Sequence, residues 1–236
     1  AAEHAMLHKE MGLSDTAEVE WSAGRPEAVD DFHVVVIGAG LSGIAAARRF
    51  KRLGISFEVV EKSDNCGGTW HHNTYPGCGV DIASHYFSYS FARNPEWERY
   101  YAKQPEILAY IRRCVELEGL TDFISYNTEV LAAEWHEQEG VWLVTTRTAD
   151  GQAREIRANV VVSAAGLLHR PSIPDLPGLA DFEGPAFHAA EWDHSVAVDG
   201  KRVALIGTGA SGNQIGPALA PVVDKLTVFQ RSAQWN

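Results

Sequence analysis

The same short pattern occurs twice in the chain, and this repeat constrains the fold more than any other feature. In each copy a β-branched apolar run leads into a turn with glycines at its first, third and sixth positions, Gly38–Gly43 and Gly207–Gly212. A helical pattern and a second apolar run follow, and this run ends 23 positions after the first glycine, at Glu61 and at Gln230. We therefore predict two strand–helix–strand units and an α/β fold with two Rossmann-like dinucleotide-binding domains.

The remaining elements are predicted from hydrophobic periodicity and turn residues. The stretch 63–103 is rich in Gly, Asn and aromatic residues, and it is expected to be long, irregular and functional. Asp150-Gly151 predicts a hairpin turn. The expected strands are 33–37, 56–60, 128–134, 141–148, 153–158, 159–164, 201–206 and 226–229, and the expected helices are 44–53, 105–118 and one that begins near residue 211.

Changes in composition along the chain predict its domains. Residues 1–31 are polar and acidic and are expected to form a partly helical extension, and 171–200 is expected to be a linker. Residues 32–170 are expected to form the first part of one domain and 201–236 the start of another. Both domains are expected to be incomplete, as in the visible portion of a longer protein.

Charge and cysteine content exclude several classes of function. The formal net charge of −11 argues against general affinity for nucleic acid or anionic membranes. No apolar run reaches the roughly 20 residues of a spanning helix, and the start lacks the pattern of a secretory signal. Three cysteines at irregular spacing indicate reduced thiols and a cytoplasmic protein. Ligand spacings of Cys and His are absent, so no metal is expected.

The first glycine turn predicts a site for a dinucleotide with a free 2′-hydroxyl. Gly38 permits the tight turn, Gly40 lets the backbone approach a pyrophosphate, and Gly43 lets the helix pack closely on the strand. The pyrophosphate would lie at the helix N-terminus, which favours anions. Glu61 has the spacing of a carboxylate that binds ribose hydroxyls and repels a phosphate there. This combination favours FAD.

The second turn differs in the residues that end its second strand. Neutral Gln230 replaces the carboxylate, and Arg231 and Ser232 follow it. The planar guanidinium of arginine suits a phosphate. We therefore expect the second unit to prefer NADPH to NADH. A solvated surface arginine is the alternative interpretation of Arg231.

A segment before the second turn resembles the signature of one enzyme family. Phe182, Gly184, His188 and Trp192, followed by Asp193, match the pattern FxGxxxHxxxW of the type I Baeyer–Villiger monooxygenases. In this family the segment also precedes the second glycine turn. The resemblance implies that His188 belongs to a linker tied to domain movement, whereas a packed structural histidine is the alternative.

Two further segments resemble the same family. Gly67–Trp70, Asn73, Tyr75–Gly77 and Asp81 follow its GGTWxxNxYPGxxxD pattern, and Ser163–Leu167 is similar to a second strand end that contacts flavin. The resemblance implies an NADPH- and O₂-dependent enzyme that converts ketones to esters or lactones through a C4a-peroxyflavin. It also implies that Asp81 orients an essential arginine, which is expected beyond Asn236. A loop-capping role for Asp81 is the alternative.

The motifs and the family pattern together give a set of expected site residues. The catalytic candidates are Asp81 and His188. The expected FAD contacts are Gly38, Gly40, Ser42, Gly43, Glu61, Gly68, Thr69, Trp70, Asp81, the backbone of Val130, and Gly166, and the expected NADPH contacts are Gly79, Val80, Asp81, Thr208, Gly209, Ala210, Ser211, Gly212, Asn213, Gln214, Arg231 and Ser232. Phe87 departs from the family, which usually has tyrosine at this position, so a hydroxyl contact would be lost.

Three other functions remain open at this stage. A flavin monooxygenase that oxidises nitrogen or sulfur would carry a different fingerprint ending from His188…Trp192. A flavin disulfide reductase needs a redox cysteine pair, which the separation of Cys66 from Cys78 disfavours. A nucleotide-binding fragment without catalysis is the third, and retention of flavin by the isolated chain would test it.

Overall fold

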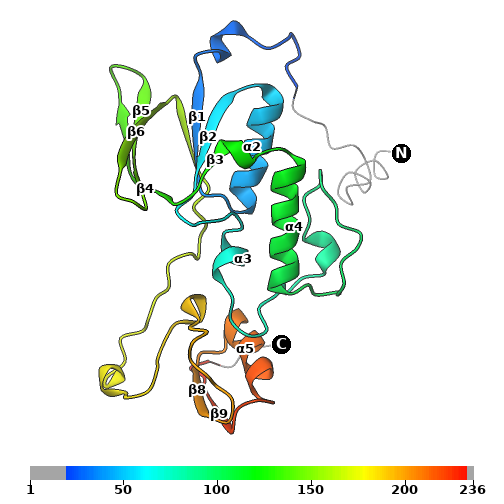
Figure 1. Cartoon of the computed structure of the whole chain (residues 1–236), viewed down its shortest axis with the longest axis vertical. Helices are drawn as coiled ribbons and strands as arrows, with labels where there is room; N and C mark the ends of the chain where they lie inside the picture. The colour runs from blue at the N-terminus through cyan, green and yellow to red at the C-terminus, as the bar shows by residue number, and fades with distance from the viewer. Residues whose placement is uncertain (1–19, 233–236) are drawn as a thin grey trace. The chain divides into compact units, whose positions relative to one another are not determined.

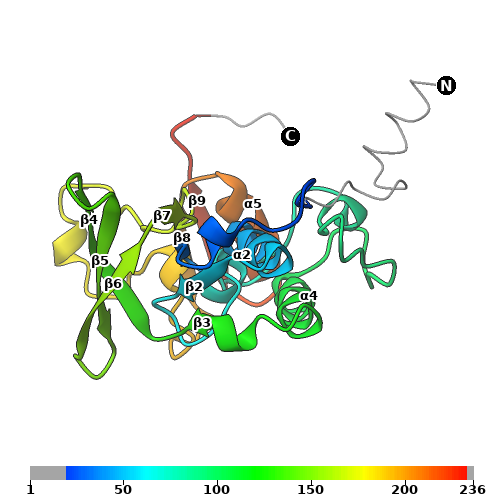
Figure 2. The same ribbon diagram turned by 90° about the horizontal axis from the view of Figure 1, so that it is seen from above.

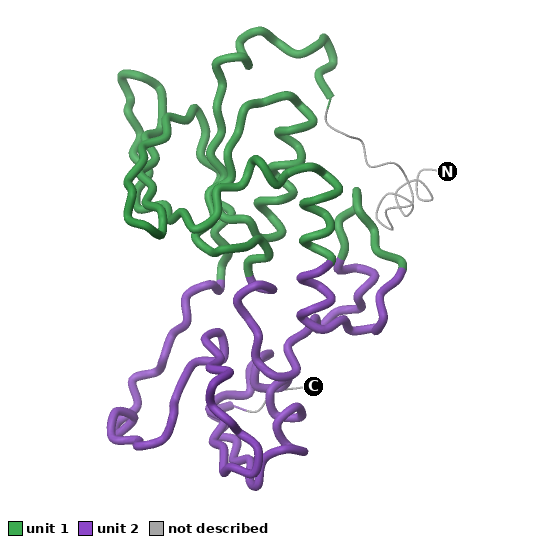
Figure 3. Tube along the Cα trace, in the orientation of Figure 1, with its two compact units in different colours: residues 1–68, 88–95, 110–167 green, residues 69–87, 96–109, 168–236 purple. Residues whose placement is uncertain are grey.

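The protein is described by a computed structural model that covers residues 20–232. Residues 1–19, which make up most of the expected extension, lie outside the described residues. Contacts divide the chain into two compact units, coloured separately in Figure 3. Unit 1 comprises residues 1–68, 88–95 and 110–167, and unit 2 comprises residues 69–87, 96–109 and 168–236. The domain boundaries predicted from composition stay a prediction.

A parallel four-stranded sheet forms the centre of unit 1. Its strand order is β3-β2-β1-β7, with β1 at His33–Ile37, β2 at Ser56–Val60, β3 at Ile124–Ser125 and β7 at Val160–Ser163. Val34, Val35 and Val36 of β1 are almost completely buried. A strand buried on both faces needs apolar side chains at consecutive positions, which explains the β-branched run in the sequence.

An antiparallel three-stranded sheet completes the strands of unit 1. It consists of β4 (Thr128–His136), β5 (Val141–Thr148) and β6 (Ala153–Ala158). The turn between β5 and β6 contains Asp150 and Gly151, whose φ of 87° confirms the predicted hairpin. Val144, Ile156 and Ala158 of this sheet pack with Val35 and Val60 in one apolar cluster. The two sheets of unit 1 therefore share a core.

Helix α2 (Leu41–Leu53) lies on the face of the parallel sheet opposite the antiparallel one, as Figures 1 and 2 show. It begins at the glycine turn, three residues before the predicted start, because Gly40 already has the extended backbone of an N-cap. Gly54 ends the helix in the left-handed conformation, with φ 63°. The Trp21 indole donates a hydrogen bond to Leu53 O over 2.9 Å.

The other described helical segments before the second glycine turn are short apart from one. Helix α4 (Gln104–Leu117) matches the predicted helix to within one residue at each end. The 63–103 stretch is not irregular throughout, because it contains α3 (Thr69–His72) and the 3₁₀ turn η2 (Ser84–Tyr86). Further 3₁₀ turns are η1 (Glu27–Val29), η3 (Thr121–Phe123), η4 (Leu179–Asp181) and η5 (Ala189–Glu191).

Unit 2 contains the second strand–helix–strand unit. Strand β8 (Arg202–Ile206) leads into α5 (Ala210–Leu219), and β9 (Lys225–Phe229) pairs with β8 in parallel. The observed bounds agree with the predicted strands to within one residue. Together the parallel sheets confirm the predicted α/β class. In residues 20–232 no helix has both the length and the apolar character needed to cross a membrane.

Candidate nucleotide-binding sites

The first glycine turn, in unit 1, requires glycine at two positions for steric reasons. Gly38 has φ +102°, and a Cβ there would lie 2.7 Å from the backbone oxygen of Ala164. A Cβ on Gly43 would lie 1.9 Å from the oxygen of Gly38, so this glycine lets the helix start close to the strand. The Gly38 N–H donates to Val60 O over 2.9 Å and fixes the turn to β2. These features are those expected of a dinucleotide-binding turn.

The carboxylate of Glu61, at the end of β2, is held against this turn. Its Oε2 accepts a hydrogen bond of 2.7 Å from Ala39 N–H, and its Oε1 accepts one of 2.9 Å from Ser63 N–H. The residue is only 6% exposed. A buried charge needs such partners, and the two N–H groups supply them. Glu61 is therefore fixed beside the glycine turn, where it was predicted to bind ribose.

A second backbone segment faces the turn. The Gly67 N–H donates to Ala39 O over 3.0 Å, and Gly68 has φ +52°. A Cβ on Gly68 would lie 3.0 Å from the Cα of Gly40, so a side chain at Gly68 would crowd the two strips of backbone. Ser42 is exposed in the first turn of α2. The site thus consists of main chain and a helix N-terminus, which suits a phosphate group.

Two more predicted FAD contacts lie in unit 1. Val130 lies beside an irregularity of the β4–β5 pairing, between Val130 and Ala132, and packs against the shared core. Gly166 follows β7 with φ +80°, and a Cβ there would meet no atom within 4 Å. The left-handed backbone of Gly166 favours glycine even though the space around it is open.

The second glycine turn, in unit 2, repeats the geometry of the first. Gly207 also has φ +102°, and its N–H donates to Phe229 O over 2.9 Å. A Cβ on Gly212 would lie 2.4 Å from Gly207 O. A Cβ on Gly209 would meet none of the described atoms within 4 Å. The described residues therefore leave open space at this position.

The two units differ in chemistry at the strand end. Gln230 Nε2 donates to the hydroxyl of Thr208 over 3.1 Å, and Thr208 is the counterpart of Ala39. Arg231 and Ser232 follow and are exposed. A neutral amide thus replaces the carboxylate, and a cation lies next to it.

The predicted residues from Thr69 to Asp81 belong to unit 2. Thr69 is exposed at the start of α3, whereas Trp70 is buried and its ring packs edge-on against Phe87 with centroids 5.3 Å apart. The ring of Phe87 therefore keeps its packing without a hydroxyl. Gln104 Nε2 donates to Trp70 O, which fixes α3 to the start of α4.

The segment that leads to Asp81 is held by backbone and side-chain bonds. Val80 is buried and its N–H donates to Ala102 O over 3.0 Å. Gly79 is bonded to the side chain of Gln214. Asp81 itself is exposed. Tyr75, which was not among the expected site residues, donates its hydroxyl hydrogen to Gln214 Oε1 over 3.0 Å. The motif around Tyr75-Pro76-Gly77 was the signal that could have revealed it.

His188 caps a short helical turn in the linker. Its Nδ1 accepts a hydrogen bond of 3.1 Å from Ala190 N–H, so the ring caps η5. The rings of Phe187 and Trp192 pack edge-on 5.2 Å apart on either side of this turn. His188 and Trp192 of the fingerprint thus flank the same short helical turn.

Comparison with known proteins decides the family. The family model described as flavin-binding monooxygenase-like matches residues 31–236. The chain belongs to this family.

Two curated relatives confirm the resemblance to Baeyer–Villiger monooxygenases. A protein of that name from Streptomyces coelicolor is 45% identical over 203 residues, which is 86% of this chain and 38% of the relative. Another of the same name, from Pseudomonas aeruginosa, is 43% identical over 211 residues, 89% of this chain and 39% of the relative. The chain thus spans less than two fifths of the length of these relatives.

Solved structures of the family have the same fold. The chain matches ε-caprolactone-bound cyclohexanone monooxygenase with a TM-score of 0.79 and 40% identity, over 86% of this chain and 41% of that one. It matches a complex of OTEMO with FAD and NADP with a TM-score of 0.78 and 36% identity, over 87% and 40% of the two chains.

Proposed function

We propose that the chain is the N-terminal portion of an NADPH- and O₂-dependent flavin monooxygenase that converts ketones to esters or lactones. The observation that carries this proposal is the pair of glycine turns with the same geometry and different strand-end residues, Glu61 and Gln230-Arg231. Two dinucleotide sites of different preference in one chain suit a transfer of hydride from a nicotinamide to a flavin. The relatives named Baeyer–Villiger monooxygenase support the choice of reaction.

The residues of the first turn fit FAD. Gly40 and Gly68 bring main chain so close that a Cβ on Gly68 would lie 3.0 Å from the other backbone, and the N-terminus of α2 begins there. This arrangement suits a pyrophosphate, and Glu61 suits the ribose hydroxyls of its adenosine. Val130 and Gly166 are the other predicted FAD contacts within unit 1.

The residues of the second turn fit NADPH. Gly209 leaves room beside the N-terminus of α5, and the exposed Arg231 and Ser232 could bind a 2′-phosphate that the carboxylate of a Glu61-type site would repel. When bound, NADPH supplies hydride and the reduced flavin activates O₂. The protein binds and orients these groups: Asp81 is proposed to hold a cationic side chain in place, and His188 to shape the linker.

The experiment that tests this proposal uses the protein at the full length of its relatives. The FAD-loaded enzyme receives NADPH, O₂ and a panel of cyclic, linear and aryl ketones, with thioethers and amines as a second panel. Products are followed by mass spectrometry with ¹⁸O₂ as label. Reactions without O₂ or without the organic substrate serve as controls.

We expect a labelled ester or lactone, formed in step with NADPH consumption. If only thioethers or amines are oxygenated, the enzyme oxidises heteroatoms and the proposed ketone reaction is wrong. Absence of bound flavin and of NADPH consumption would refute the proposal and leave a nucleotide-binding fragment.

A further inference from the structure

The side chain of Gln214 on α5 makes a two-point pairing with one backbone residue. Its Nε2 donates to Gly79 O over 2.9 Å, and its Oε1 accepts from Gly79 N–H over 3.3 Å. The same Oε1 also accepts from the Tyr75 hydroxyl over 3.0 Å. We call these three residues, all within unit 2, the Gln214 clasp. An amide carries a donor and an acceptor side by side, whereas an ionised carboxylate only accepts.

The segment 75–79, called the loop below, also contacts α5 through its backbone. A Cβ on Gly77, where φ is +83°, would lie 2.3 Å from Gln214 O and 3.2 Å from the Cβ of Ala218. No side chain other than hydrogen fits between the loop and the helix at this point. Gly77 therefore brings the loop into the range of the Gln214 amide.

The opposite side of the loop is also fixed. Gly79 forms an antiparallel bridge with Lys103, and Lys103 Nζ donates to Gly77 O over 3.0 Å. Burial raises the pKa of the Tyr75 phenol, so its hydroxyl stays protonated and able to donate to Gln214. Gly79 is thus held from two directions, two residues before the exposed Asp81.

We propose that Gln214 is a positioning residue that places Asp81 for the reaction by holding Gly79. Its position on α5, five residues after Gly209, connects the second glycine turn with the segment that carries Asp81. This role differs from the direct NADPH contact expected from the family pattern, because the clasp already uses both ends of the amide. The effect on the reaction rests on the proposed function. The hydrogen bonds of the clasp can be measured whether or not that function is correct.

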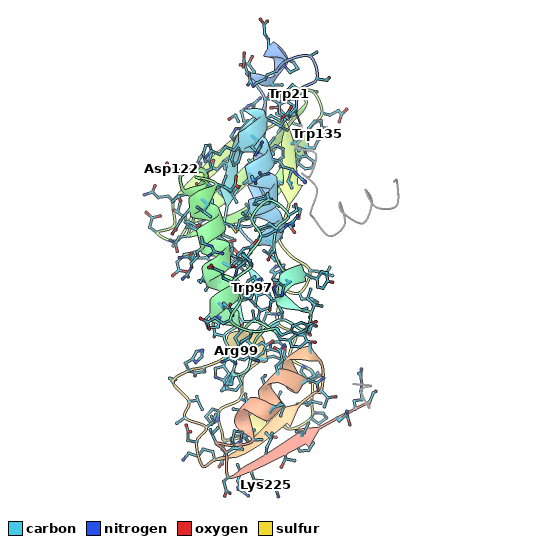
Figure 4. All side chains as sticks on the ribbon, turned by 90° about the vertical axis from the view of Figure 1, so that its right-hand side faces the viewer. Trp21, Trp97, Arg99, Asp122, Trp135 and Lys225 are labelled. Atoms are coloured by element: carbon cyan, nitrogen blue, oxygen red, sulfur yellow. The ribbon has the colours of Figure 1, made fainter. Side chains whose placement is uncertain are left out.

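The test compares Gln214→Glu, Tyr75→Phe and Lys225→Gln in the FAD-loaded protein at the full length of its relatives. Gln214→Glu keeps the shape but replaces the donor to Gly79 O by a second acceptor. Tyr75→Phe keeps both bonds to Gly79. Lys225 is exposed at the start of β9 (Figure 4) and is the matched surface control. Thermal unfolding first shows whether each variant is folded.

The first readout is amide hydrogen exchange in the peptide that contains residues 76–83. Exchange in Gln214→Glu is expected to be roughly five- to thirty-fold faster than in wild type, the range for loss of one or two hydrogen bonds. Tyr75→Phe and Lys225→Gln are expected to stay within about twofold. Unchanged exchange in a folded Gln214→Glu variant would overturn the proposal.

The second readout is anaerobic reduction of the flavin by saturating NADPH, followed by its absorbance. We expect a rate about tenfold lower in Gln214→Glu, because misplaced groups are inefficient even when the nucleotide is bound. Faster exchange with a wild-type rate would make the clasp purely structural and overturn the positioning role. If NADPH does not reduce the wild-type flavin, the proposed function fails, and exchange alone then supports or overturns the clasp.

Discussion

The Oε2 atom of Glu61 lies 2.7 Å from the backbone nitrogen of Ala39, which donates its hydrogen to it. In the second unit Gln230 bonds the hydroxyl of Thr208, the counterpart of Ala39, over 3.1 Å. The side chain at the strand end is thus held at the glycine turn in both units. What differs is its charge, and with it the nucleotide that each turn is proposed to bind.

Replacing Glu61 by Gln tests the importance of the carboxylate. The amide can accept from only one of the Ala39 and Ser63 N–H groups with its oxygen, and its NH₂ would face the other. We expect the loss of a charge-assisted hydrogen bond to lower the free energy of unfolding by about 1.5–3 kcal/mol. Urea denaturation of the FAD-free protein measures this, and FAD titration should show weaker binding.

The matched control is Glu129→Gln. Glu129 and its partner Arg147 are each about half exposed, with side-chain exposures of 52%. Such surface pairs contribute little, so the free energy of unfolding should change by less than about 0.5 kcal/mol. Equal effects of the two substitutions would contradict a special role for Glu61.

Two glycines of the second turn should respond differently to alanine. In Gly212→Ala the new methyl would lie 2.4 Å from Gly207 O. We therefore expect the free energy of unfolding to fall by about 1–3 kcal/mol, as at overpacked sites. In Gly209→Ala the methyl meets no protein atom within 4 Å. Thermal unfolding should therefore be nearly unchanged in Gly209→Ala, while titration shows weaker binding of NADP⁺. Unaltered NADP⁺ affinity would argue against a phosphate at this position.

Arg231 should determine the choice of nicotinamide nucleotide. In Arg231→Ala we expect kcat/KM for NADPH to fall about 10- to 100-fold, the effect of losing hydrogen bonds between two charged groups. The value for NADH should change little, since NADH lacks the 2′-phosphate. Steady-state kinetics with both nucleotides measures the ratio. Arg202→Gln, at the exposed start of β8, is the control, and an equal loss for both nucleotides in Arg231→Ala would contradict the assignment.

Much of the fold could be predicted because its signals are local. The β-branched run of β1 and the turn Gly38–Gly43 depend only on neighbouring residues, and both were located correctly. Strand β3 was missed because it has two residues, Ile124–Ser125, and its pairing with β2 depends on the tertiary structure. Helix α3 was missed for a similar reason, since four residues give no apolar period.

The sequence located the residues of the site better than it predicted the contacts between them. Spacing located Glu61, but its bond to Ala39 N–H became visible only in three dimensions. Gln214 was selected through the family pattern, whereas its pairing with Gly79 joins residues 135 positions apart in the chain. No local sequence pattern encodes such a contact.

The three cysteines should react slowly in the folded protein. Cys66, Cys78 and Cys114 are all buried, and burial raises the pKa of each thiol. A raised pKa leaves less thiolate at pH 8, so alkylation by iodoacetamide should be much slower than in the unfolded protein and should accelerate as the pH rises. Mass spectrometry counts the labels, with guanidinium-unfolded protein as the control. Rapid labelling of Cys66 or Cys78 would instead support a redox thiol and the disulfide reductase alternative.

Two roles of the His188 side chain can be separated by mutation: capping of η5, and any role that needs the imidazole itself. The bond from Ala190 N–H to its Nδ1 is an N-cap, and its loss in His188→Ala should lower stability by about 1 kcal/mol. His188→Asn offers a side-chain oxygen to the same N–H and should restore the stability, as thermal unfolding would show. If the linker needs only the cap, His188→Asn should also restore the NADPH-dependent turnover lost in His188→Ala. Restored stability with defective turnover would assign a separate role to the imidazole.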